Sequence, residues 1–185
     1  MNFSKHCDLC QNEITNIEKG LTCKLTNKRP EFKNTCSEIK LSKKFQAKIE
    51  ITNLELEIIS KTKSSVHSTF YFLIIIGFTL IIGGYYFSKE NIESVYVMQI
   101  AFGILSVGVT FLGVAYNKLN EFRRKNSNAE FDKYELDEFL QKYGIEYKTD
   151  ISFKEKIHGI QEIMVRVDYK NWKKKRTTTP YKHNC

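Results

Sequence analysis

Four cysteines near the N-terminus are the residues whose type and spacing could do chemistry. Cys7 and Cys10 form a Cys-x2-Cys pair, and Cys23 and Cys36 follow within the same thirty residues. Such a pair brings two thiolates to one metal ion through a tight turn, and two further cysteines can complete a tetrahedral sulfur shell without an open position. The pattern therefore predicts a structural zinc site in a small module, residues 1–40.

Disulfides and redox chemistry are the alternatives to zinc at these cysteines, and His6 could replace one of the four ligands. The charge pattern described below places this segment in the cytoplasm, where thiols are kept reduced, and this disfavours two disulfides. A redox Cys-x2-Cys pair normally opens a helix beside a sheet, and no such pattern surrounds residues 6–11. Between residues 4 and 36 there are also too few apolar side chains to form a core without a metal.

Two long uncharged runs, residues 70–87 and 95–116, occupy the middle of the chain. About 20 apolar residues in a helix span the hydrocarbon core of a bilayer. Buried helices of a large soluble protein are the alternative, but a chain of 185 residues has no core large enough to bury two such rods. We predict a transmembrane hairpin over residues 67–117, with spans at 69–88 and 95–116.

Basic residues flank these spans and leave the connecting loop, residues 88–94, with Lys89 alone. They are Lys40, Lys43, Lys44, Lys48, Lys61 and Lys63 before the hairpin, and Lys118, Arg123, Arg124 and Lys125 after it. By the positive-inside rule both termini face the cytoplasm, as in a multi-pass protein of the inner membrane. The first forty residues are polar, so we expect the first span to act as an uncleaved signal.

The second span carries small residues on two faces. On one face, small residues occur every seven positions: Ala101, Gly108 and Ala115. On the other face, they are spaced by three, four and three positions: Gly103, Ser106, Thr110 and Gly113. Small residues let membrane helices approach closely. One face could contact the first span and the other a second subunit, although glycine is also common in membrane helices without such a role.

The chemistry available inside the bilayer is narrow. No ionisable residue lies within either span, so we expect no proton relay or charged transport site there. A pore would be lined by Gln99, Ser106 and Thr110, or by apolar rings that close by dewetting. The four histidines are scattered, and no catalytic triad, phosphate-binding glycine loop or open metal site emerges, so we expect no enzyme.

Helices are also predicted on both sides of the hairpin. Apolar residues at 4, 3 and 4 spacing predict an amphipathic stem helix over residues 41–66 that continues into the first span. In the C-terminal region, residues 118–169, the Ser127-x2-Glu130 capping box begins a predicted helix that ends at Gly144. Residues 152–167 fit helical spacing, but the alternation from Ile163 to Tyr169 fits a strand equally, so the region is helical or α+β.

The last sixteen residues, 170–185, form a basic tail that contains Lys173, Lys174, Lys175 and Arg176. Such a cluster can bind anionic lipid headgroups or nucleic-acid phosphates. Lipid is the nearer partner for a membrane protein, and nucleic acid is less favoured. We expect the tail itself to be solvated and disordered.

The segments CDLC, GLTCKLTNKRPEF and NTCSEIKL resemble the zinc-ribbon-like N-terminal module of small membrane proteins from flavobacteria-like bacteria. This resemblance covers about thirty residues and implies no particular activity. In size, span count and host, the chain is also similar to the membrane accessory proteins of type VI-B CRISPR loci, which implies a role in antiviral defence. No catalytic or binding motif carries that second similarity.

The sequence thus predicts a mainly α membrane protein with a small zinc module, and two functions from different classes. In the first, hairpins assemble into a homo-oligomer that perturbs or perforates the membrane, with the cytoplasmic parts assembling or triggering it. In the second, the hairpin only anchors a zinc-binding adaptor or redox sensor that recruits a cytoplasmic protein partner.

Overall fold

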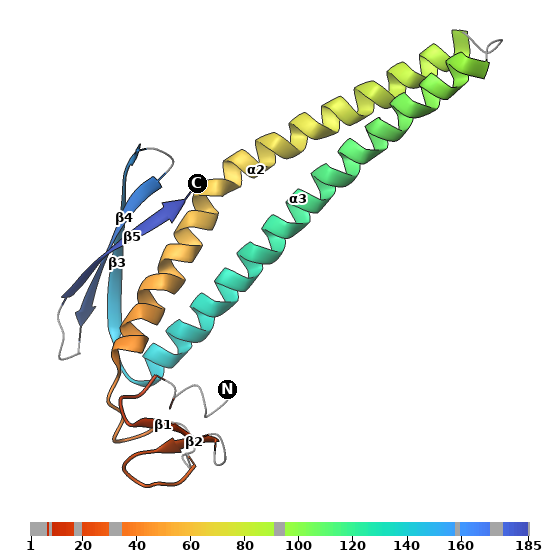
Figure 1. The fold of residues 1–185 in the computed structure, drawn as a ribbon. Helices are drawn as coiled ribbons and strands as arrows, with labels where there is room; N and C mark the ends of the chain where they lie inside the picture. Colours follow the sequence, from red (N-terminus) through yellow and green to blue (C-terminus); the bar gives the residue numbers. More distant parts are fainter. Residues whose placement is uncertain are drawn as a thin grey trace. The chain divides into compact units, whose positions relative to one another are not determined.

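The computed structural model of the chain describes residues 7, 9–16, 20–29, 35–90, 95–157, 160–170 and 176–184. Its elements are β1 (Glu13–Asn16), β2 (Gly20–Cys23), α2 (Lys43–Glu90), α3 (Val95–Lys142), β3 (Glu146–Ile157), β4 (Ile160–Lys170) and β5 (Arg176–Asn184) (Figure 1). Most residues of the described structure lie in the two long helices, so the predicted mainly α class is confirmed at the level of helix content. Two small antiparallel sheets accompany them.

Contacts divide the chain into two units. We call residues 58–129 the hairpin unit, and residues 1–57 with 130–185 the terminal unit. The helices α2 and α3 each have 48 residues, and each passes from one unit into the other without a break. The predicted continuity of the stem helix with the first span is therefore confirmed.

The predicted start of a separate helix at the Ser127 capping box is wrong. The helix α3 runs through this position because its sequence has neither glycine nor proline between Gly113 and Tyr143. It ends as predicted at Gly144, which has a φ of 63°. The Gly144 amide donates to Gln141 O (3.1 Å) and the Ile145 amide to Leu140 O (3.0 Å), which satisfies the last carbonyls of the helix.

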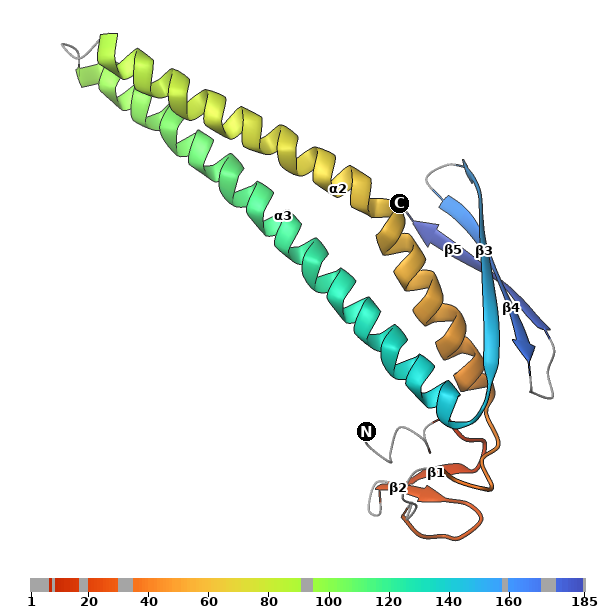
Figure 2. The ribbon, with the colours of Figure 1, turned by 180° about the vertical axis from the view of Figure 1, so that it is seen from behind.

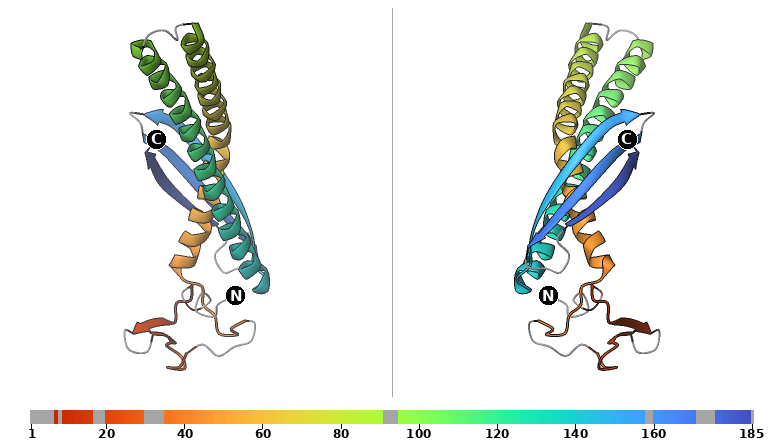
Figure 3. Two further views of the ribbon diagram at one scale, coloured as in Figure 1. Left: turned by 90° about the vertical axis from the view of Figure 1, so that its right-hand side faces the viewer. Right: turned by 90° about the vertical axis from the view of Figure 1, so that its left-hand side faces the viewer.

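Residues 146–157, 160–170 and 176–184 form a three-stranded antiparallel sheet of order β3-β4-β5 (Figure 3). The helical reading of residues 152–167 is therefore wrong, and the strand reading holds. Alternate residues of β4, namely Ile163, Val165 and Val167, are fully buried, which satisfies a period of two and not the helical period.

The expected disorder of the tail is also wrong for residues 176–184, which form β5. This strand pairs with β4 from Asp168↔Arg176 to Ile160↔Asn184. Its Pro180 is compatible with an edge strand, where a missing N–H need not break a ladder on both sides.

The terminal unit has one hydrophobic core between its helical segments and the sheet. The sheet lies along the N-terminal part of α2 in Figure 2. The buried apolar residues of this core include Phe45, Ile49 and Leu54 of α2, Leu136, Phe139 and Leu140 of α3, and Ile163, Val165 and Val167 of β4. The rings of Phe45 and Phe139 lie 5.6 Å apart, so they connect the two helices.

Candidate functional site

Backbone pairing brings the two ends of the cysteine segment together. Cys10 forms an isolated antiparallel bridge with Leu41, and hydrogen bonds run from Gln11 N to Lys40 O (2.6 Å) and from Ser42 N to Leu9 O (3.0 Å). The β1–β2 hairpin follows directly after Cys10 and places Cys23 opposite Glu13. The chain around Cys10 is therefore held by the segment that follows Cys36.

The four cysteines lie in three tight turns. The Cys10 amide donates to Cys7 O at 2.9 Å, which closes the turn of the Cys-x2-Cys pair. Asn27 N donates to Cys23 O (2.8 Å), and Ile39 N to Cys36 O (3.4 Å). The Asn12 amide donates to Cys10 Sγ at 3.5 Å.

The four thiols are free, half-buried and close enough to interact electrostatically. Burial, together with the charges of Cys10, Cys23 and Cys36, raises the pKa of Cys7 to about 11. A divalent cation among these sulfurs would reverse this preference, because a coordinated thiol loses its proton.

The donor chemistry of these cysteines fits zinc, although their side chains do not ligate as they stand. Among the described residues, no three histidine, cysteine or acidic side chains are placed closely enough to hold a metal ion. His6, the alternative ligand, lies outside the described residues. The four-cysteine zinc site therefore remains a prediction.

Tyr143 connects the cysteine segment to the core, a role that no sequence pattern predicted. Its hydroxyl accepts a hydrogen bond from the Cys36 amide at 3.1 Å. Its ring lies 4.9 Å from that of Phe139, which in turn contacts Phe45. Burial raises the pKa of Tyr143, so the hydroxyl stays neutral. Lys44 and Glu13 add an ion pair of 3.0 Å.

The structure uses the two small-residue faces of α3 differently. Ala101, Gly108 and Ala115 are buried, and Gly108 lies against Gly77 of α2. A Cβ atom on Gly108 would lie 2.8 Å from Ile81 Cγ1 and 3.0 Å from Gly77 O, so only glycine permits this approach. Gly77 and Gly84, also buried and seven residues apart, are the partners that the sequence reading overlooked.

The second face is exposed in the described structure. A Cβ atom on Gly103 or Gly113 would meet nothing within 4 Å. Ser106 and Thr110 are exposed as well, and their hydroxyls donate to carbonyls of their own helix, Gly103 O (2.8 Å) and Ser106 O (2.9 Å). This face therefore has room for another helix and no unsatisfied hydroxyl.

Of the four residues in the predicted basic cluster, the structure describes Arg176. Lys173, Lys174 and Lys175 lie outside the described residues, and Arg176 Nε donates to Asp168 Oδ1 at 2.5 Å. The charge of Arg176 is thus already paired within the sheet.

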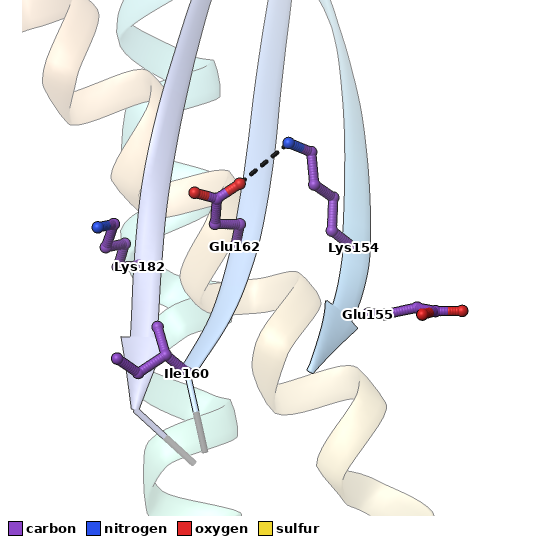
Figure 4. Close-up of a pocket in the computed structure, with 5 residues that line it drawn as sticks. All are labelled: Lys154, Glu155, Ile160, Glu162 and Lys182. Carbon is purple, nitrogen blue, oxygen red and sulfur yellow. Dashed lines mark hydrogen bonds and ion pairs between the residues drawn. The ribbon is translucent and has the colours of Figure 1, made fainter. Parts of the chain in front are cut away.

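A shallow hollow of about 350 Å³ lies near the other end of the sheet (Figure 4). There Lys154 of β3 reaches across to Glu162 of β4 at 2.9 Å, and Lys182 of β5 stands on the other side of Glu162. The hydrogen bond from Lys154 lowers the pKa of Glu162. Mixed charges that already pair with each other make a poor anion site.

Comparison with known proteins gives no matching family model, no matching curated protein and no matching solved structure.

Proposed function

We propose that this chain is a bacterial inner-membrane protein whose two helices span the bilayer and whose ends are both cytoplasmic. One observation carries the proposal: α2 and α3 each contain an apolar window of 18 residues, and only 11% of each window is buried. The core helix of a soluble protein would be mostly buried. Large side chains such as Phe72, Ile75 and Phe102 are more than 60% exposed, and lipid is the solvent that removes them from water.

The orientation can be tested with the native cysteines, since all five lie outside the hairpin unit. On intact spheroplasts, a membrane-impermeant maleimide should label none of them, and permeabilisation with a zinc chelator should expose them. The variant Ser88→Cys, at the loop end of α2, should be labelled without permeabilisation. Labelling of wild-type protein on intact spheroplasts would contradict cytoplasmic ends.

We further propose that the hairpins assemble into a homo-oligomer that perturbs or perforates the membrane. The exposed face of Gly103, Ser106, Thr110 and Gly113 supports this, because small residues allow the close approach that drives association of helices in lipid. The face of Gly108 is already filled within one hairpin and is not available to a second copy.

Matched glycine variants test the assembly. Gly113→Leu should lower the mass in detergent measured by light scattering, and should abolish ion flux into liposomes. Gly83→Leu is the control, because a Cβ there also meets nothing within 4 Å but lies on the other helix. A wild-type monomer, or equal flux from both variants, would contradict the proposal.

An accessory role in antiviral defence is the biological setting we propose for such an effector. It is supported by the similarity in size and span count to the membrane accessory proteins of type VI-B CRISPR loci. Phage plating on cells that carry an RNA-guided nuclease, with and without this chain, tests it. Equal plating efficiency would contradict this setting while leaving the membrane proposal intact.

A membrane-anchored zinc-binding adaptor or redox sensor is the second candidate. The contact of Tyr143 with the Cys36 amide favours it, because it couples the cysteine segment to a folded core that could display it to a protein partner. Zinc measured on the purified protein should approach one ion per chain. Zinc well below that, with Cys7 and Cys10 freely alkylated, would contradict a metal module.

A further inference from the structure

A cavity of about 400 Å³ opens between α2 and α3 within the hairpin unit, just beyond the apolar runs. Four of its lining residues follow helical spacing on α2 (Thr62, Ser65, Val66 and Thr69), and four do so on α3 (Lys118, Glu121, Phe122 and Lys125). Each set therefore lies on one face of its helix. The volume falls in the range of about 300–1,000 Å³ that small-ligand sites occupy.

The cavity carries one cation that its own residues do not neutralise. Lys125 pairs with Glu121 at 2.7 Å, and this contact lowers the pKa of Glu121, so the pair is ionised and its charges balance. Lys118 forms no ion pair or hydrogen bond with any described residue. The lining residues thus have a net charge of +1, which complements a single negative charge.

Hydroxyl groups complete the polar side of the cavity. Thr62 donates to Ile58 O (2.8 Å) and Ile59 O (3.0 Å), so its oxygen is left as an acceptor. Ser65 and Thr69 have no hydrogen-bond partner among the described residues and can donate to an oxyanion. Val66 and Phe122 supply an apolar surface beside these groups, and the His67 ring lies edge-to-face with the Phe122 ring, 6.0 Å away.

We propose that this cavity binds the headgroup of an anionic glycerophospholipid with a monoanionic phosphodiester, such as phosphatidylglycerol. The inference rests on the proposed membrane insertion. In that setting the cavity lies at the inner interface, since Thr69 precedes the first apolar run directly and Lys118 follows the second by two residues. Basic pockets between membrane helices at this depth suit anionic headgroups. Lys118 and the Ser65 and Thr69 hydroxyls bind the phosphate, and the acyl chains follow the exposed apolar helix surface.

Native mass spectrometry of the full-length, delipidated protein in detergent tests the site, because a micelle lacks the surface potential of a membrane. Wild-type protein should bind phosphatidylglycerol more tightly than phosphatidylcholine. Lys118→Gln should weaken phosphatidylglycerol binding about tenfold, the loss expected when a hydrogen bond between charged groups is removed. Lys118→Arg should retain binding, which shows that the hairpin remains folded.

Lys63→Gln is the matched control, since Lys63 is exposed on α2 near the cavity but does not line it. It should weaken binding less than twofold. Equal losses in Lys118→Gln and Lys63→Gln, or no preference for the anionic lipid, would overturn the proposal. Displacement of the lipid by millimolar inorganic phosphate would instead indicate a site for small anions and would overturn it too. Release of the protein from membranes by alkaline carbonate would contradict membrane insertion itself, so the two failures are distinguishable.

Discussion

At the scale of single residues, two polar networks join the sheet to the helices of the terminal unit. Tyr181 of β5 donates to Glu50 Oε2 at 2.9 Å, and Glu50 is only 5% exposed. Around Tyr147 of β3, Asn53 lies at 3.3 Å and Asp137 at 2.7 Å, with Lys133 over the ring. Buried polar groups that are satisfied in this way fix one arrangement of strands on helices, since any other would leave them unpaired.

Removing the Tyr181 hydroxyl should destabilise the terminal unit by about 1–3 kcal/mol, because Glu50 would remain buried without its partner. Denaturant unfolding of Tyr181→Phe in detergent, followed by hydrogen exchange in β4 and β5, measures this change. Tyr134→Phe provides the same chemical substitution at an exposed residue of the same unit and should leave stability unchanged. Similar losses in both variants would rule out a specific role for the Glu50 contact.

Alkaline pH should destabilise the same unit. Burial raises the pKa of Tyr169 and of Tyr181 to about 12, whereas an unfolded tyrosine ionises near its ordinary value of 10. Between these values the unfolded state binds fewer protons, so the free energy of unfolding falls as pH rises from about 10 to 12. Unfolding measured across this window should show the decline, and Tyr169→Phe should make it shallower. A flat profile for the wild type would contradict it.

At the scale of elements, the hairpin depends on close approach of two helices at glycine. Gly108→Ala should destabilise the hairpin by about 1–3 kcal/mol, because the new methyl group would meet both Ile81 and the backbone of Gly77. Gly83→Ala, in open space on α2, should be neutral or stabilising by up to about 1 kcal/mol, as in a helix interior. Thermal unfolding in detergent compares the two, and a neutral Gly108→Ala would mean that the helices can separate freely.

The elements that the sequence predicted well are those whose signal is local. The two long apolar helices and the stem follow from uninterrupted hydropathy and helical spacing, and Gly144 marks the end of α3 by its own conformational freedom. The sheet was harder to predict, because Ser152 and Glu155 imitate a helix start, whereas β3 is stabilised by pairing with the next strand, β4. The sequence from Thr177 to Thr179 is typical of a disordered tail, but these residues form a strand because they pair with β4.

The candidate sites also divide into features with a local sequence signal and features that depend on tertiary contacts. Cysteine spacing predicts a shared site for four thiols, because ligand type and spacing are local features of the sequence, and this site stays a prediction. Sequence could also separate the two faces of α3, but it could not say which of them contacts α2. Gly77 and the cavity around Lys118 depend on the register of two antiparallel helices, which no single helix encodes.

At the scale of the whole molecule, the terminal unit is built from both ends of the chain. A protein that ends at residue 175 lacks β5, so β4 would lose its neighbour and Glu50 its tyrosine. We expect hydrogen exchange to accelerate across residues 146–170, because an open sheet edge and a buried unpaired carboxylate both destabilise the core. Removal of Cys185 alone is the control. Unchanged protection in the shortened chain would show that β5 is dispensable.

This arrangement also constrains the order of events during synthesis. Residues 43–57 leave the ribosome before the two long apolar runs, yet β5, the edge strand of the sheet that packs with them, follows both runs in the chain. The core therefore cannot close until residues 176–184 have been synthesised, by which time both apolar runs have already been translated. The helices of the hairpin unit are thus synthesised before the terminal unit can fold. Until β5 is available, the core around Phe45 and Ile49 is incomplete, and a chaperone could bind these exposed apolar side chains.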